Sequence, residues 1–385
     1  MTEAADLAQI REAVRALCAN FPGAYWRGLD RERTYPEEFV AALTKAGFLA
    51  ALIPEEYGGS GLSMTAAAAI MEEIQASGCN GAACHAQMYT MGTVLGHGSA
   101  EQKTRYLPGI ARGELRLQAF GVTEPTSGTD TLSLRTTAIR DGDHYVINGQ
   151  KIWTSRAEHS DLMLLLARTT PREQAASRTA GLSVFLVDMR KVKGKGLTIR
   201  PIRTMMNHAT TEVFIENMRV PADSLVGGEG EGFRYILSGM NAERILIAAE
   251  CIGDAKWFIA KAASYAGERV VFGRPIGQNQ GVQFPIARAY MGMRAAELMV
   301  REAAALYEAG KECGAEANMA KQLAAEASWA AADMCVQTHG GFGFAEEFDI
   351  ERKFRETRLY TVAPISTNLI LSYVAEHMLG LPRSY

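Results

Sequence analysis

The sequence contains few cysteines, and none stands at the spacing of a metal-binding or redox pair. Six occur in 385 residues, and no two of them form a CxxC motif. Cys84 beside His85 could begin a metal site, but no second ligand pair follows at a suitable spacing. Scattered single cysteines in a chain of this length are typical of core packing in a reducing cytoplasm, so we predict no metal site.

The chain also lacks a large net charge, a targeting segment and a long apolar run. Its formal charge is −3, which argues against nucleic acid or an anionic membrane as the main partner. The N-terminal MTEAADLAQIREAV is acidic and amphipathic, unlike a secretory signal or an Arg-rich transit peptide. No apolar run approaches membrane-spanning length. We therefore expect a globular cytoplasmic protein with neither nucleic acid nor a membrane as partner.

Three sections with different periodicity follow one another. Residues 1–118 are predicted to be helical, and YPEEFVAALTKAGF has an entry at Tyr35-Pro36 and a stop at Gly47. Residues 119–229 are predicted to form strands, with an Asp-Gly turn at 141–142 and an Asn-Gly turn at 148–149. Residues 230–385 contain four stretches of helical period, which favours an antiparallel four-helix bundle.

The predicted fold class is therefore α+β and mostly α. It has an N-terminal helical domain, a middle β-barrel or sandwich domain and a C-terminal four-helix bundle. A doubly wound α/β enzyme has no support. GGEGEG at 227–232 lacks the preceding strand and the downstream acid of a dinucleotide-binding turn.

Three motifs stand out, and the residue types of the first two suit a bound flat ring or, for the first, a phosphate. FGVTEPTSGTD (120–130) offers small residues and hydroxyls, although a polar turn explains its composition equally well. GQKIWTSRAEHSD (149–161) places an aromatic residue beside hydroxyls, although a strand-end Trp is often core. QTHGGFGFAEEFDIERKFRE (337–356) has a Gly pair that also suits an ordinary helix end.

Together, the order of these motifs and the helix–strand–helix plan resemble the acyl-CoA dehydrogenase family. TEPTSGTD and QTHGGFG match both signature stretches of that family, and RVVFGRPIGQNQGVQF (269–284) matches its flavin-contacting segment. The resemblance runs from about Tyr35 to Ile370.

The resemblance implies non-covalent FAD, homodimers or homotetramers, and an electron-transferring flavoprotein as acceptor. Ser155 would lie near flavin N5, and Trp153 would flank the ring. Arg269, Gln280 and the Gln337–Gly341 segment would reach the FAD of a neighbouring subunit. The implied cofactor-binding residues are Phe120, Val122, Thr123, Gly128, Thr129, Trp153, Thr154, Ser155, Arg269, Phe272, Gln280, Gln337, Gly340, Gly341, Ser366 and Asn368.

The usual catalytic glutamate of the family is replaced here. Its place falls in Ala363-Pro364-Ile365-Ser366, and the stretch from Leu359 to Ala375 contains no carboxylate. A minority of the family, with isovaleryl-CoA-dehydrogenase-like placement, carries the base directly before the substrate-site Arg. Here that position is Glu243.

Residues around Glu243 match the implied substrate site. Arg244 and Asn241 are three residues apart on one helix face and match the substrate-contacting pair, with Thr129 as a further contact. A solvated or ion-paired helix residue is the plain alternative for Glu243. If Glu243 is the base, it must lie in an apolar pocket with a pKa raised toward neutrality.

Pro364 raises a second question. The resemblance implies that a backbone N–H at this position helps to hold the thioester oxygen, and proline has no N–H. The Ile365 N–H could replace it, the flavin ribityl hydroxyl could act alone, or the acyl group could sit differently. The smaller Ala363-Pro364 pair also leaves room for a branched acyl group.

The predicted function is FAD-dependent α,β-dehydrogenation of an acyl-CoA to the trans-2-enoyl-CoA, in fatty acid or branched-chain acyl-CoA metabolism. The alternatives are a family offshoot with other flavin-site chemistry (enoyl-CoA reduction, nitroalkane oxidation or a non-redox lyase step) and a non-catalytic acyl-CoA- or flavin-binding protein.

Overall fold

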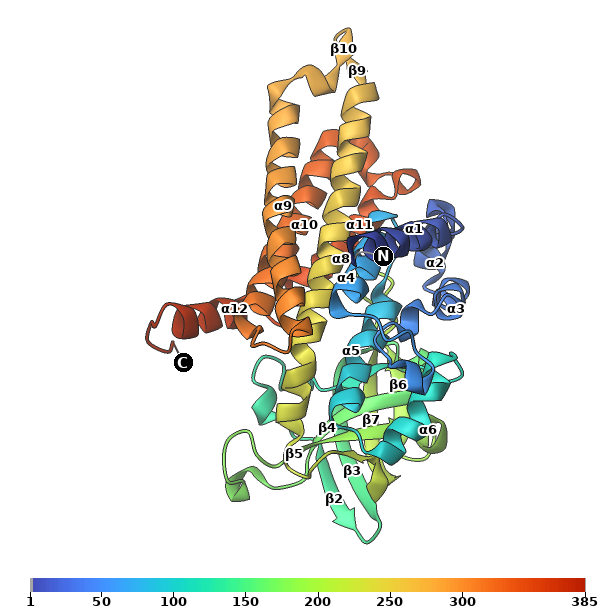
Figure 1. Cartoon of the computed structure of the whole chain (residues 1–385), viewed down its shortest axis with the longest axis vertical. Coiled ribbons are helices and arrows are strands. Elements are labelled where there is room, and N and C mark those ends of the chain that lie inside the picture. Colours follow the sequence, from blue (N-terminus) through green and yellow to red (C-terminus); the bar gives the residue numbers. More distant parts are fainter. Residues whose placement is uncertain (1–2, 385) are drawn as a thin grey trace. The chain divides into compact units, whose positions relative to one another are not determined.

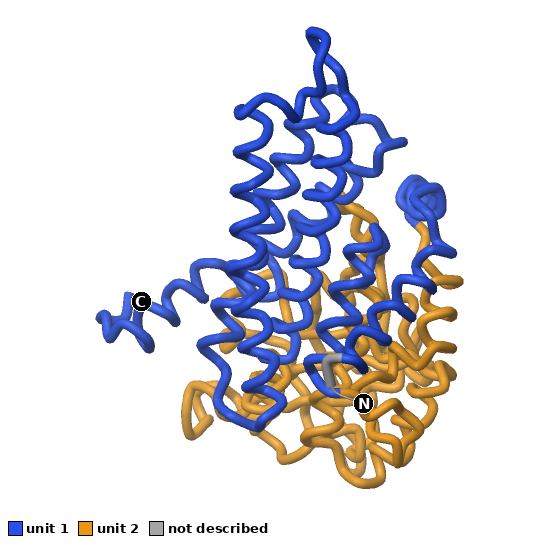
Figure 2. The backbone as a smooth tube through the Cα atoms, turned by 45° about the horizontal axis from the view of Figure 1, so that its top comes forward, with its two compact units in different colours: residues 1–33, 63–81, 241–385 blue, residues 34–62, 82–240 orange. Residues whose placement is uncertain are grey.

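The computed structural model describes residues 3–384 and divides the chain into two compact units. Unit 1 contains residues 1–33, 63–81 and 241–385, and unit 2 contains residues 34–62 and 82–240 (Figure 2). Within residues 3–384, no helix combines the length and apolarity needed to cross a lipid bilayer.

Unit 1 is built from helices. The long α8, α9 and α10 run side by side, and a small antiparallel hairpin of β9 (Val270–Val271) and β10 (Arg274–Pro275) joins α8 to α9 (Figure 1). The predicted fourth helix is short and continues as a single π-helical turn, Val374–Met378. The helices are α1 (Glu3–Cys18), α2 (Gly23–Glu32), α4 (Met64–Ala76), α8 (Gly232–Glu268, from residue 241 on), α9 (Gln280–Glu308), α10 (Gly314–His339), α11 (Ile350–Thr357) and α12 (Thr367–Tyr373).

A buried lysine ties three of these helices together. Lys353 of α11 has no exposed surface, donates to Gln75 Oε1 of α4 at 2.6 Å and pairs with Asp254 of α8. Burial raises the pKa of Asp254 to about 6, although Lys353 opposes this shift. Removing either Lys353 or Asp254 should therefore destabilise the fold strongly, because the remaining charge would be buried without a partner.

Unit 2 packs helices with one sheet. Its strand order is β6-β7-β3-β2-β4-β5-β8, and β1 pairs in parallel with β4. The helices are α3 (Glu37–Lys45), α5 (Ala82–His97), α6 (Ala100–Ala111) and the short α7 (Met189–Val192). The strands are β1 (Leu117–Gly121), β2 (Thr137–Asp141), β3 (His144–Ser155), β4 (Leu162–Arg168), β5 (Leu182–Asp188), β6 (Leu197–Pro201), β7 (Thr210–Pro221) and β8 (Leu225–Val226).

Strand β4 explains why the sheet has a core on each face. Every residue of LMLLLAR is buried, as expected for a continuous apolar run with no solvent-facing side. Alternate side chains then enter two different clusters. Leu164 packs with residues of α5 and α6, whereas Leu165 packs with Tyr145 and Val213 of neighbouring strands.

The local signals of α3 and of the first hairpin are confirmed. Helix α3 begins just after Tyr35-Pro36, and Gly47 adopts a φ of 80° beyond its end. Asp141 pairs with His144, so Gly142 and Asp143 form the two-residue turn between β2 and β3.

The prediction of a second turn at Asn148-Gly149 is wrong. Both residues lie inside β3, where the register against β7 shifts between Ile147 and Gly149. A Cβ on Gly149 would lie 2.3 Å from Thr136 Oγ1, so the glycine is needed for close packing at a bulge. The Asn-Gly pair therefore marks a bulge and a close approach of backbone.

The N-terminal helices are divided between the units. Helices α1, α2 and α4 belong to unit 1, whereas α3, α5 and α6 belong to unit 2. The boundaries at residues 118 and 229 therefore stay a prediction from sequence.

The bulge predicts different outcomes for two glycines of β2–β3. Gly149→Ala should lower the free energy of unfolding by about 2 kcal/mol, because its Cβ overpacks against Thr136. Gly142→Ala should cost about 1 kcal/mol, since its φ of 63° is unfavourable but nothing lies within 4 Å of the new Cβ. Urea denaturation of both variants measures the difference. Equal losses would contradict the close approach at Gly149.

Candidate active site

In unit 2, the first signature loop is held by a buried ion pair. Glu124 accepts hydrogen bonds from the Arg135 N–H at 2.6 Å and the Thr136 N–H at 2.9 Å. Lys151 of β3 has no exposed surface and donates to Glu124 Oε1 at 2.9 Å and to the Val122 carbonyl at 3.0 Å. One ammonium thus joins the loop after β1 to the middle of β3.

Both members of this pair remain charged at neutral pH. Burial lowers the pKa of Lys151 to about 8, although Glu124 opposes the shift. Burial alone would raise the pKa of Glu124, but Lys151 and the hydrogen bonds from residues 135 and 136 hold it below its ordinary value. The pair therefore keeps its Coulomb attraction as well as its hydrogen bonds.

The second motif places Trp153 at a bulge. Lys151 pairs with Val213 and Thr154 with Thr211, so the strand register shifts between these two pairs. Trp153 takes a φ of 61° and leaves 55% of its surface exposed. A non-glycine residue held in this conformation and an exposed indole both suggest a binding role.

The structure brings the first two motifs together. The Ile152 N–H donates to the Thr123 carbonyl at 2.9 Å, so the Trp153–Ser155 segment follows directly beside the loop. Thr154 is buried, and its Oγ1 has no hydrogen-bond partner among residues 3–384. Phe120, Val122 and Ser155 are half-buried, and Gly128 and Thr129 are exposed.

These residues fit a flavin as the family implies. An exposed indole can cover part of a flat ring, and small residues let backbone approach it. The hydroxyls of Thr123 and Ser155 and the unsatisfied Thr154 Oγ1 can form hydrogen bonds with the polar edge of the ring. The predicted cofactor residues from Arg269 onward lie in unit 1.

In unit 1, the predicted substrate pair is formed on α8. The Arg244 guanidinium donates to Asn241 Oδ1 at 2.7 Å, as the three-residue spacing predicts. Burial lowers the pKa of Arg244, and its Nε is buried without a hydrogen-bond partner among the described residues. An unused donor on a buried guanidinium is suited to an acceptor oxygen of a ligand.

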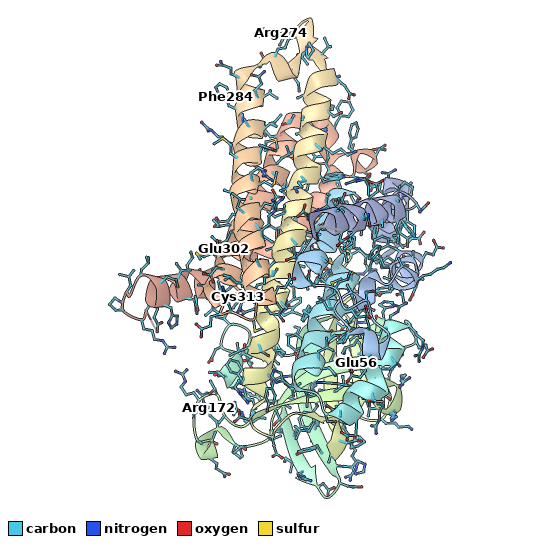
Figure 3. All side chains as sticks on the ribbon, viewed as in Figure 1. Glu56, Arg172, Arg274, Phe284, Glu302 and Cys313 are labelled. Carbon is cyan, nitrogen blue, oxygen red and sulfur yellow. The ribbon has the colours of Figure 1, made fainter. Side chains whose placement is uncertain are left out.

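Glu243 is buried and has a raised pKa. Only 6% of its surface is exposed, and burial raises its pKa to about 7, with Arg244 partly opposing the shift. The expected burial and raised pKa are therefore present. Cys313 lies beside Asn241 and Arg244 at the lower end of the helix bundle (Figure 3).

The cofactor residues predicted at 269–280 and 337–341 lie far from Glu243 within unit 1. Arg269 follows the last residue of α8, and its guanidinium lies 5.7 Å from the ring centroid of Phe342, next to Gly340 and Gly341. Arg274 labels this upper end of the bundle in Figure 3. Glu243 and Glu268 are separated by roughly 38 Å of helix at 1.5 Å per residue. Phe272, Gln280 and Gln337 are exposed.

Ser366 and Asn368 mark the start of α12. The Ser366 hydroxyl accepts the Leu369 N–H at 3.4 Å as a helix cap, and Asn368 is exposed. Lys321 of α10 donates to the Ile365 carbonyl at 3.0 Å. Within residues 3–384, no cluster of three or more His, Cys, Asp or Glu side chains could hold a metal ion. All six cysteines are buried, and none forms a disulfide within the same residues.

Sequence reasoning missed the two lysines that hold these loops. Lys151 and Lys321 are both fully buried, which is rare for this residue type. A lysine inside the apolar, alanine-rich stretch ANMAKQLAAEAS was the available signal for Lys321. The bulge at Gly149 hid the corresponding signal for Lys151, because it interrupts the alternation along β3.

The ion pair of the signature loop can be tested by removing one or both charges. Lys151→Met should lower the free energy of unfolding by about 3–5 kcal/mol, because Glu124 remains buried and uncompensated. Lys151→Met combined with Glu124→Gln should recover part of this loss, since the amide oxygen still accepts from residues 135 and 136. Thermal and urea denaturation of both proteins measure the effect. A double variant less stable than the single one would contradict a charge-based account.

Comparison with known proteins identifies the family of this arrangement. Three family models match: the acyl-CoA dehydrogenase N-terminal domain over residues 4–114, the middle domain over 119–218 and the C-terminal domain over 230–379. Acyl-CoA dehydrogenase FadE12 of Mycobacterium tuberculosis (strain ATCC 25618 / H37Rv) is 36% identical over 100% of this chain and 98% of its own length.

Two further relatives are similar over most of the chain. A 3-(aryl)acrylate reductase of Clostridium sporogenes is 32% identical, covering 91% of this chain and 92% of that protein. The structure of a glutaryl-CoA dehydrogenase in complex with glutaryl-CoA has a TM-score of 0.92 at 30% identity, covering 100% of this chain and 97% of that one. The chain therefore belongs to the acyl-CoA dehydrogenase family.

Proposed function

We propose that the chain removes hydrogen from Cα and Cβ of an acyl-CoA thioester with Glu243 as the catalytic base. As a family member it is an oxidoreductase acting on acyl-CoA. The observation that carries the finer proposal is the buried carboxyl of Glu243, whose pKa is raised to about 7, directly before Arg244.

The chemistry explains why this carboxyl suits the task. A thioester α-proton is only weakly acidic, so its removal needs a base whose pKa lies near the working pH. A solvated glutamate has a pKa near 4.3 and is a much weaker base. The segment Leu359–Ala375 offers no carboxylate, and Pro364 occupies the place where most of the family carries its base. This placement corresponds to the isovaleryl-CoA-dehydrogenase-like subset of the family.

Arg244 and Asn241 would orient the substrate beside this base. Arg244 is fixed by its hydrogen bond to Asn241 and has an unused Nε donor. The residues Thr123, Trp153 and Ser155 would hold FAD, which supplies the acceptor for the hydride leaving Cβ when it is bound. Electrons would then pass to an electron-transferring flavoprotein.

The distance along α8 between Glu243 and Arg269 supports a homo-oligomer. A flavin beside Glu243 cannot also reach Arg269 of the same chain, because roughly 38 Å of helix lies between them. Arg269, Phe272 and Gln280 would therefore serve the FAD of a second subunit. Helix α9 also leaves four large apolar side chains exposed to between 50% and 69%: Phe284, Tyr290, Met291 and Leu298. Phe284 lies near the upper end of α9 (Figure 3).

Enoyl-CoA reduction is the second candidate. The relative named 3-(aryl)acrylate reductase is 32% identical to this chain, and Pro364 removes one donor for the thioester oxygen. The same Glu243 carboxyl, protonated below its pKa, could then deliver a proton to Cα. Two anaerobic experiments distinguish the preferred direction of the reaction. In one, the oxidised protein is mixed with acyl-CoA and flavin reduction is followed; in the other, the reduced protein is mixed with enoyl-CoA and flavin oxidation is followed.

The base assignment predicts a specific loss in Glu243→Gln. Glutamine keeps the size of the side chain but cannot accept the α-proton, so flavin reduction by acyl-CoA should slow by about 100-fold or more. In the unchanged protein the rate should rise with pH around a midpoint near 7, because the carboxyl must be ionised to act. Stopped-flow absorbance at 450 nm on the FAD-loaded proteins measures both.

Glu302→Gln is the matched control for this change. Glu302 is exposed on α9, so the same loss of charge should leave the rate and its pH dependence unchanged (Figure 3). Flavin reduction at the unchanged rate in Glu243→Gln would mean that another group is the base. Absence of reduction by every thioester of a straight-chain and branched panel would support the non-catalytic alternative.

The shared-flavin proposal predicts that assembly and FAD binding are linked. The purified protein should be yellow, with one FAD per subunit in a homo-oligomer. Met291→Glu with Leu298→Glu on α9 should shift the mass toward the monomer and weaken FAD binding about tenfold or more. Ile139→Glu changes an equally exposed apolar residue of β2 and should affect neither. Light scattering and FAD titration test this, and a monomer that retains FAD fully would contradict sharing.

A further inference from the structure

The segment before α12 is tethered at three points. The Val362 and Ala363 N–H groups both donate to the Leu359 carbonyl at 2.9 Å, which fixes its beginning. The Ser366 cap fixes its end. Between them, Pro364 has no N–H, and the Ile365 carbonyl is held by Lys321 Nζ at 3.0 Å. The lysine is therefore the tether of the middle of this segment.

Lys321 is an unusual side chain for a purely structural contact. It has no exposed surface, and burial lowers its pKa. No carboxylate among residues 3–384 forms an ion pair with it, and its hydrogen-bond acceptor is a neutral backbone carbonyl. The charged and titratable groups that face it are Arg244 and Cys251, both on α8. A buried ammonium without an acidic partner is costly, which suggests that it is retained for more than packing.

The position of Lys321 connects the tethered segment with the proposed substrate residues. It contacts Ile365 directly, and it lies close enough to Arg244 for their charges to interact. Arg244 directly follows Glu243 on α8 and bonds to Asn241. The Ile365 backbone is therefore near residues 241–244 of α8, where the reaction is proposed to occur.

The N–H of Ile365 differs from its neighbours in the tethered segment. It has no hydrogen-bond acceptor among the described residues, although the neighbouring amides at 362 and 363 are both satisfied. The hydrogen bond from Lys321 to the Ile365 carbonyl fixes the peptide plane between residues 365 and 366. The Ile365 N–H lies in the preceding plane, between this fixed plane and the bonded Ala363 amide, so Lys321 supplies one of the two restraints on its direction.

We propose that Lys321 is a positioning residue that aims the Ile365 N–H at the thioester oxygen of the substrate. This inference rests on the proposed function. As Glu243 takes the α-proton, the electron pair left on Cα delocalises into the carbonyl, and negative charge grows on its oxygen. A fixed N–H donor at that oxygen lowers the barrier to this step. The N–H of residue 365 thus serves where Pro364 cannot.

The test compares three variants on α10. Lys321→Met removes the ammonium and keeps the length of the side chain, whereas Lys321→Arg retains a cationic donor. Gln322→Met is the matched control, because Gln322 is also buried on α10 but bonds only within its own helix, to Glu326. Each protein is loaded with FAD and checked for FAD content and melting temperature.

The kinetic readout separates positioning from folding. The limiting rate of flavin reduction by the best thioester of the panel should fall by about 100-fold in Lys321→Met. The half-saturating concentration should change little, because the acyl-CoA contacts remain. Lys321→Arg should recover most of the rate, and Gln322→Met should retain it even if both methionine variants melt at a similar lower temperature.

A spectroscopic readout does not depend on turnover. A thioester labelled with ¹³C at its carbonyl is bound to Glu243→Gln protein, and the carbonyl stretch is recorded by infrared difference spectroscopy. A hydrogen-bonded carbonyl absorbs at lower frequency, so adding Lys321→Met should move the band upward. A structural role alone would leave this band in place in every molecule that binds the thioester.

Either readout can overturn the inference. An unchanged limiting rate or an unchanged carbonyl band in Lys321→Met contradicts it. If Lys321→Met does not fold, Ile365→Pro decides, because it deletes the N–H and keeps Lys321 and its acceptor; an unchanged band then contradicts the proposal. If unmodified protein binds thioesters but none bleaches its flavin, the proposed function fails, whereas the carbonyl band still reports on Lys321.

Discussion

The buried contact between Lys151 and Glu124 is the constraint on which the first signature loop of unit 2 depends. Glu124 gathers two backbone N–H groups and one ammonium, and Lys151 also binds the Val122 carbonyl. The loop between β1 and β2 has few apolar side chains to bury, so packing alone cannot fix it. Charge-assisted hydrogen bonds from a rigid strand supply the missing restraint. The same contacts of Lys151 position Thr123 in the loop relative to Trp153 in β3.

Unit 1 uses buried lysines in a similar way. Lys353 joins α11 to α4 and α8, and Lys321 joins α10 to the segment before α12. An ammonium has three donors, so it can satisfy carbonyls and carboxylates of several elements at once. Such contacts are sensitive to mutation because the remaining polar groups would stay buried and unpaired. They also give irregular segments a single conformation that apolar packing would leave loose.

The sequence predicts much of this fold where local chemistry decides the structure. The hairpin turn predicted at Asp141-Gly142, which forms at Gly142-Asp143, and the end of α3 near Gly47 follow from backbone preferences that act over a few residues. Asn148-Gly149 has the same local preference, but pairing with β7 and the close approach of Thr136 override it. The partners of Lys151 and Lys321 lie 27 and 44 residues away. Contacts of that kind depend on tertiary structure, so no short window of sequence reveals them.

The proposed base on α8, in place of one in the loop at 363–366, has consequences for both segments. A helix holds Glu243 by backbone hydrogen bonds that do not depend on its side chain, so the carboxyl can stay without the polar partners that would lower its pKa. Burial then raises the pKa of Glu243 to about 7, while Arg244, one residue on, limits the rise. The loop is freed from carrying an acid and can accept Pro364. Pro364 has no N–H, and we propose that the fully buried Lys321, bonded to the neighbouring Ile365 carbonyl, compensates for this missing donor.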